Sequence, residues 1–125
     1  PSENGGFLQV SGLTYEIHTG VASSAEKDEN GMFTRVSGEY RVKNVMVGGQ
    51  PLELDKTYTL ASHNYMLLGH GDGYTMFDGC EVLGEDMMVD NQVLINYIQN
   101  NLKGVVGSEY AAPQGRITIR IVAVE

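Results

Sequence analysis

Alternating apolar and polar side chains mark the first strand near the start of the chain. Leu13, Tyr15 and Ile17 alternate with polar neighbours, the two-residue period of a β-strand with one buried face. The stretch YRVKNVMVGGQPLELDKTYTLASH (40–63) then predicts a strand, a tight turn at Gly48-Gly49, a short return strand and a further strand over 57–62. These segments indicate a sheet built from hairpins.

Two other segments differ in their polarity. Residues 117–124, ITIRIVAV, are rich in β-branched side chains and predict a final, largely buried strand. Residues 23–39, SSAEKDENGMFTRVSGE, are polar and interrupted by glycine, which predicts a long surface loop.

One helix is predicted from Asp90, as its N-cap, to Gly104, as the glycine that ends it. Its apolar side chains recur at helical spacing on one face: Val93, Leu94, Tyr97, Ile98 and Leu102. A shorter helix is expected over 64–68. Together the pattern predicts an α+β fold in a single domain over 1–125, with a mostly antiparallel or mixed sheet, hairpins and a few packed helices.

Charge narrows the possible partners. The chain has 125 residues and a formal net charge of −8, with eight scattered cations. A polyanionic partner is disfavoured because phosphate backbones are bound by clustered Lys and Arg, so we expect no nucleic-acid polymer. No apolar stretch approaches the roughly 18 residues of a membrane-spanning helix, so no membrane span is expected in this chain.

Motifs for catalysis are not recognisable. The three histidines, His18, His63 and His70, do not have metal-binding spacing, and no nucleophile elbow is present. We therefore expect no catalytic residue and no metal ligand here. The single cysteine, Cys80, is expected to be a small buried apolar residue.

The run Gly-His-Gly-Asp-Gly over 69–73 is the most unusual local feature. It is neither a P-loop nor a dinucleotide fingerprint. Its glycines allow close approach of the backbone to a ligand, and the carboxylate of Asp72 could accept two hydrogen bonds from a vicinal diol such as ribose. The alternative is an Asx-type turn in which Asp72 caps its own backbone. The flanking Tyr65, Tyr74 and Phe77 are typical of core packing or of a ligand platform.

Four motifs resemble one family in order and spacing: GGFLQVSGL (5–13), GGQPLELDKTYTLASHNYM (48–66), GDGYTMF (71–77) and QGRITI (114–119). They are similar to the C-terminal, nucleotide-binding domain of the 5′-nucleotidase family, which includes UDP-sugar hydrolases and 2′,3′-cyclic-nucleotide phosphodiesterases. The resemblance implies a base held between the rings of Phe7 and Tyr65. It also implies a ribose bound by Asp72 in the Gly71-Asp72-Gly73 loop.

The same resemblance implies what lies elsewhere. In the family an N-terminal metallophosphoesterase domain with two divalent metal ions performs the hydrolysis. The chain is expected to be a fragment of the C-terminal domain that lacks this catalytic domain and is inactive alone. The parent protein would be a secreted, periplasmic or cell-surface phosphohydrolase.

The sequence departs from the family pattern in two respects, and it also allows a competing hypothesis. His70 stands where the family usually has glycine, and the family's domain begins upstream of Phe7 with further ligands. The competing hypothesis is a non-catalytic carbohydrate- or metal-binding module that uses carboxylates of Asp72, Asp78, Asp86 and Asp90. These carboxylates lack the regular spacing of a calcium loop. Base preference, phosphate number and oligomeric state stay open.

Overall fold

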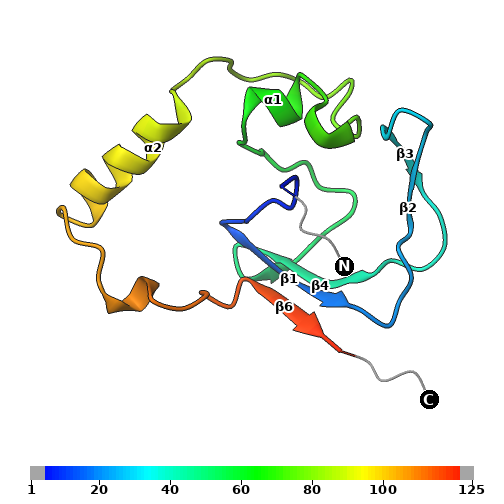
Figure 1. Cartoon of the computed structure of the whole chain (residues 1–125), viewed down its shortest axis with the longest axis horizontal. Coiled ribbons are helices and arrows are strands. Elements are labelled where there is room, and N and C mark those ends of the chain that lie inside the picture. Colours follow the sequence, from blue (N-terminus) through cyan, green and yellow to red (C-terminus); the bar gives the residue numbers. More distant parts are fainter. Residues whose placement is uncertain (1–4, 122–125) are drawn as a thin grey trace.

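The structure, a computed structural model, describes residues 5–121 and contains one four-stranded sheet (Figure 1). The strand order is β5–β4–β1–β6, formed by β1 (Leu13–His18), β4 (Val42–Val47), β5 (Gln50–Pro51) and β6 (Ile117–Arg120). β1 is central: it pairs antiparallel with β4 and parallel with β6. The mixed sheet and the few short helices confirm the α+β prediction.

The predicted hairpin at Gly48-Gly49 is confirmed. A two-residue loop joins Val47 to Gln50, and both glycines have positive φ, +57° and +78°. That combination is typical of a type I′ turn, whose twist matches that of the flanking strands. The pattern of glycines therefore predicted the turn for the right physical reason.

The strand predicted over 57–62 is wrong. Those residues form an irregular connection without sheet pairing. β5 pairs with β4 only at Gln50 and Pro51, and proline has no N–H to extend the ladder. The chain leaves the sheet there, so the alternation in 57–62 finds no neighbouring strand.

The last strand is shorter and more exposed than predicted. β6 ends at Arg120, and Ile119 and Ile121 are 61% and 86% exposed. As an edge strand, β6 has a neighbour, β1, on one side only. Residues 122–124 of the prediction lie outside the described part of the chain.

Residues 23–39 form a hairpin, where the sequence predicted a loop. β2 (Ala25–Lys27) and β3 (Phe33–Val36) pair antiparallel as a separate two-stranded sheet. An ion pair between Glu26 and Arg35, 2.6 Å long, crosses the two strands. The strands are short and mostly exposed, which explains why polarity alone indicated a loop.

The short predicted helix is confirmed as α1 (Asn64–Leu67). It is followed by a 3-10 turn, η1 (Gly71–Gly73), and the two pack together. Met66 of α1 is the one buried apolar side chain among the described residues, 7% exposed. α1 therefore presents Met66 to the interior while its neighbours stay near the surface.

The longer helix is present as α2 (Asp90–Asn96), which continues as the π-helical turn η2 (Tyr97–Asn101). The prediction of its cap is wrong: Val89 is the N-cap, and Asp90 lies in the first turn. Gly104 ends the segment as predicted, with a φ of +81° and an N–H bonded to the Ile98 carbonyl.

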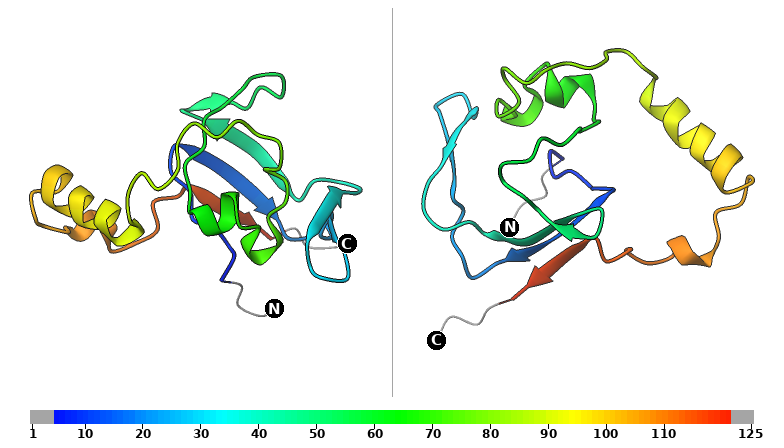
Figure 2. Two further views of the ribbon diagram at one scale, coloured as in Figure 1. Left: turned by 90° about the horizontal axis from the view of Figure 1, so that it is seen from above. Right: turned by 180° about the vertical axis from the view of Figure 1, so that it is seen from behind.

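α2 stands apart from the sheet in every view (Figures 1 and 2). It packs chiefly against its own continuation η2, and a 3-10 turn, η3 (Ser108–Tyr110), leads back toward β6. Val93, Leu94 and Tyr97 of its apolar face are 53%, 60% and 45% exposed. The same helix that the apolar period predicts thus lacks a packing partner among the described residues.

The accessible surface agrees with this open arrangement. It is 10165 Å² for a chain of 13.6 kDa. A compact monomer of that mass exposes about 6,600 Å². Cys80, expected to be buried, is exposed as well, because the connection that carries it runs outside any packed layer. Burial in this chain is concentrated near α1 and η1.

Candidate functional site

The 69–73 loop is a tight, left-handed turn. His70 and Asp72 both have a φ of +55°, and Gly73 follows at +82°. Aspartate tolerates this region better than most residues because its short polar side chain can be accommodated there. Backbone hydrogen bonds from Gly73 to His70 (2.9 Å) and from Tyr74 to Gly71 (3.3 Å) close the turn. These two hydrogen bonds hold the backbone of the turn from which the Asp72 side chain projects.

The ring of Tyr65, which comes from α1, lies directly on the backbone of Gly71. A β-carbon at position 71 would overlap the Cδ1, Cε1 and Cζ atoms of that ring. Glycine is therefore required here by close approach. Tyr65 still has 59% of its surface exposed. Tyr65 and Gly71, both candidates from the sequence, are thus brought together.

The N-terminal segment reaches the other side of the same loop. The Tyr74 hydroxyl donates to the carbonyl of Gly6 at 2.8 Å. A β-carbon on Gly6 would stand 2.9 Å from the Asp72 Cβ, so the two residues touch. Phe7 follows Gly6 directly and is 48% exposed. Burial raises the pKa of the Tyr74 hydroxyl, and the Asp72 carboxylate adds to the effect.

A hollow of about 190 Å³ lies beside Asp72. Its wall consists of residues from three separate segments: Gly6, Ala25, Lys27, Phe33, Asp72, Gly73, Tyr74 and Met76. Within residues 5–121, the Asp72 carboxylate takes part in no hydrogen bond or ion pair, so it does not cap its own backbone in an Asx turn. Phe7 and Tyr65 do not line the hollow. Phe7 follows the lining residue Gly6, and the Tyr65 ring contacts Gly71, which lies next to Asp72 in the chain.

The β2–β3 hairpin forms one wall of this hollow, which the sequence did not indicate. The carbonyl oxygen of Gly31 occupies the place where a β-carbon on Gly73 would be. The Thr75 hydroxyl donates to the Phe33 carbonyl at 2.5 Å. The polarity and glycine content of the sequence do not predict these contacts, because the contacts depend on how closely two distant backbone segments approach each other.

His70 turns toward Asp78. Its Nε2 lies 2.6 Å from the Asp78 Oδ1, and the imidazole is not part of the hollow's wall. Tyr74 and Phe77 stack on each other, with ring centroids 6.4 Å apart and an angle of 11° between the planes. Their stacking agrees with the core-packing alternative for these two rings.

Metal-ligating side chains do not gather among the residues that the structure describes. No group of three or more His, Cys, Asp or Glu side chains is placed to hold an ion there. Asp78, one of the four carboxylates of the competing metal-site hypothesis, is already paired with His70. Over the same residues, no helix has the length and apolar character needed to cross a bilayer.

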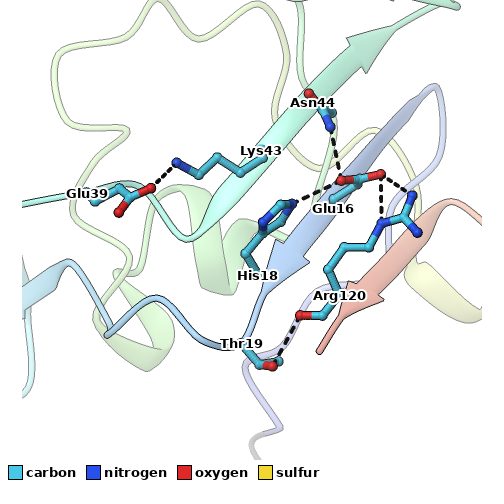
Figure 3. A network of polar contacts seen from close by, with 7 residues as sticks. All are labelled: Glu16, His18, Thr19, Glu39, Lys43, Asn44 and Arg120. Atoms are coloured by element: carbon cyan, nitrogen blue, oxygen red, sulfur yellow. Dashed lines mark hydrogen bonds and ion pairs between the residues drawn. The ribbon is translucent and has the colours of Figure 1, made fainter. Parts of the chain in front are cut away.

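A second polar cluster lies on the sheet (Figure 3). Glu16 accepts hydrogen bonds from Arg120 on β6 (2.6 and 3.1 Å) and Asn44 on β4 (3.0 Å), and it lies 3.0 Å from His18. The Arg120 bond, followed by the one to His18, lowers the pKa of Glu16 to about 2. Its side chain is 18% exposed. With its lone pairs occupied, Glu16 joins three strands and has no capacity left for a ligand.

Comparison with known proteins places this geometry in context. The sequence model of a family described as "5′-nucleotidase, C-terminal domain" matches residues 1–79. Protein UshA of Yersinia enterocolitica is 37% identical over 79 residues, which are 63% of this chain and 14% of that protein. A 5′-nucleotidase of Vibrio vulnificus is 26% identical over 120 residues, 96% of this chain and 18% of that protein.

The chain spans less than a fifth of the length of either relative. No solved structure is significantly similar to it. The family match, over residues 1–79, includes Phe7 before β1 as well as Tyr65 and Asp72.

Proposed function

The chain belongs to the 5′-nucleotidase C-terminal domain family, and from that premise we propose that it binds the nucleoside part of a nucleotide for a 5′-nucleotidase-like phosphohydrolase. The observation on which this rests most is the Asp72 carboxylate. It stands beside a small hollow, without a partner among residues 5–121, on a turn enclosed by glycine backbone.

Asp72 binds the ribose. Two carboxylate oxygens match the two hydroxyls of a vicinal diol, and hydrogen bonds to a charged acceptor are the stronger kind. Asp72 and Gly73 both line the hollow, so a sugar bound there lies against the turn. The hollow of about 190 Å³ is smaller than the roughly 300–1,000 Å³ of sites for whole drug-sized ligands, so it suits a sugar and leaves the base outside.

The base is held by the rings of Phe7 and Tyr65. Both are about half exposed. Phe7 follows the lining residue Gly6, and the Tyr65 ring lies on Gly71, which precedes the lining residue Asp72. Stacking of one base on one aromatic ring contributes roughly 1–3 kcal/mol. Loss of either ring should weaken binding by about tenfold or more.

Hydrolysis belongs to another part of the parent protein, an N-terminal metallophosphoesterase domain with two divalent metal ions. The described residues of this chain have no ligand cluster for such ions. In this proposal the chain positions the substrate for that domain. The parent is exported to the periplasm or cell surface, where it degrades nucleotides.

The test is a chemical-shift titration of the full chain with adenosine, adenine and 2′,3′-dideoxyadenosine. We expect adenosine to bind most tightly, at about millimolar affinity, with shifts at Gly71, Asp72 and Gly73. Asp72→Asn should reduce adenosine binding to the level of the dideoxy compound, since asparagine tolerates positive φ but lacks the charge. Asp55→Asn, an exposed acidic residue away from the hollow, is the matched control.

A second pair of variants tests the rings. Tyr65→Leu should weaken adenosine and adenine alike, whereas Tyr40→Leu, at a tyrosine of similar exposure (62%), should change neither. Absence of shifts near Asp72 with every ligand would contradict the proposal. Calorimetry with calcium separates the competing module: heat with calcium and none with adenosine would favour a metal-binding role.

A further inference from the structure

The β2–β3 hairpin is held in a fixed position against the 69–73 loop. The Asp28 carboxylate accepts hydrogen bonds from the N–H groups of Asn30 (2.9 Å) and Met32 (2.8 Å), which shapes the hairpin turn. The Thr75–Phe33 hydrogen bond attaches the hairpin to the segment after the loop. Lys27 is the last residue of β2, directly before this turn, so its backbone is positioned relative to Asp72.

The hollow has one charge of each sign in its wall. Lys27 is the cation and Asp72 the anion, and all other lining residues are neutral. Within residues 5–121, Lys27 makes no ion pair, although the chain has a net charge of −8. Four of the eight cations are in ion pairs: Arg35, Lys43, Lys56 and Arg120. Among the same described residues, Arg41, Lys103 and Arg116 are in none, like Lys27, but of these four unpaired cations Lys27 is the one that lines the hollow. A cation left without a carboxylate in so acidic a chain, beside a hollow, is suited to bind an anion.

We propose that Lys27 is the anion-binding residue of this site and binds a phosphate group of a nucleotide whose ribose is held by Asp72. This inference rests on the proposed function. A lysine ammonium is a compact point charge on a flexible stem that binds phosphate well, and Lys27 lines the hollow. The hairpin then makes the site prefer nucleotides over nucleosides.

The size of the hollow agrees with a ligand whose sugar and phosphate lie in the hollow and whose base lies outside it. At about 190 Å³ it is too small for a whole nucleotide but accommodates a sugar with its phosphate at one side. Phe33, from the same hairpin, supplies an apolar wall next to Lys27. The base lies outside, against Phe7 and Tyr65.

The experiment compares AMP, adenosine and inorganic phosphate in chemical-shift titrations of the full chain and of Lys27→Gln. We expect AMP to bind the native chain about tenfold more tightly than adenosine, since a hydrogen bond to a charged group has that effect. Lys27→Gln should abolish this ratio and leave adenosine binding unchanged. Lys27→Arg, which keeps the charge, should restore it, and Lys103→Gln, at a lysine that lines no part of the hollow, should have no effect.

Salt gives a second readout. The preference for AMP in the native chain should decrease as ionic strength rises, because the site is open to solvent. An unchanged ratio of AMP to adenosine affinity in Lys27→Gln would overturn the role of Lys27 while leaving nucleoside binding intact. Binding of inorganic phosphate at Lys27 without any adenosine binding would contradict the proposed nucleoside site, and with it the ribose-linked role of Lys27.

Discussion

The loop region around Asp72 and the α2 arm (α2 with its continuation η2, residues 90–101) both have clear sequence signals. They differ in how much the rest of the chain packs against them. Around the loop, Gly6 touches Asp72 and Gly73 touches Gly31, so segments far apart along the chain meet there. Gly71 touches Tyr65 of the preceding helix α1. Along α2, most of the apolar face that the helical period predicts remains exposed, although Ile98 and Leu102 are partly buried. Periodicity therefore indicates which face of a helix is apolar, whereas the contacts that bury it have to come from elsewhere.

Length adds to the difference. α2 has seven residues and η2 a further five, and isolated helices below about 12–15 residues are marginal in water. β1, in contrast, is paired on both sides. The loop region is in turn supported by contacts with the N-terminal segment and the β2–β3 hairpin, whereas the arm has to rely on its own hydrogen bonds.

Hydrogen exchange should show the largest effect, as a difference between the central strand β1 and the α2 arm. Amides of β1 that pair with β4 and β6 should exchange about a hundredfold or more slowly than amides of α2, because the arm opens locally without disturbing the sheet. Mass spectrometry of peptic peptides over 13–18 and 90–101 measures this. Equal protection in both would mean that α2 is packed in solution.

Substitution of Gly71 should damage the loop region strongly. Gly71→Ala places a methyl group in the Tyr65 ring, and we expect a loss of about 2 kcal/mol of folding stability, within the range for overpacking. Gly5→Ala is the control, since a β-carbon there meets nothing within 4 Å. Urea denaturation compares the two; similar midpoints would show that the Tyr65 ring moves away without cost.

The Glu16 cluster should make the sheet, and not the arm, sensitive to acid. The pKa of Glu16 is lowered from 4.5 to about 2, so its stabilising contribution is complete above 4.5 and is lost as the pH falls through about 2. Glu16→Gln should reduce stability above pH 4.5 and flatten the acid limb. Thermal unfolding from pH 2 to 7 tests this, and an unchanged acid limb in the variant would exclude the role of Glu16.

A substitution on α2 should have the smallest effect. Leu94 is 60% exposed, so Leu94→Gln should change stability by less than about 0.5 kcal/mol. Leu13→Gln, in the half-buried first strand, should cost more. If Leu94→Gln proved the more destabilising, the arm would have a packing partner in solution.

The sequence predicted local features well where one or two residues decide them. The Gly48-Gly49 turn, β1 and both helices are confirmed because their signals are steric or periodic and act within a few residues. The predictions were wrong where contacts with another segment decide the structure. Residues 57–62 have no partner strand, whereas the two halves of 23–39 pair with each other as β2 and β3. Cys80 lies on an exposed connection. Propensity does not encode such pairings.

The candidate site divides in the same way. By itself the sequence determined that Gly71, Asp72 and Gly73 form a turn with a carboxylate at its tip, since positive φ and a short acidic side chain are local properties. Only the tertiary structure decided that Gly6 and the β2–β3 hairpin contact that turn, and that Lys27 and Asp72 line the same hollow. Such approaches join segments far apart along the chain, and they arise from backbone packing, which no short pattern of residues specifies.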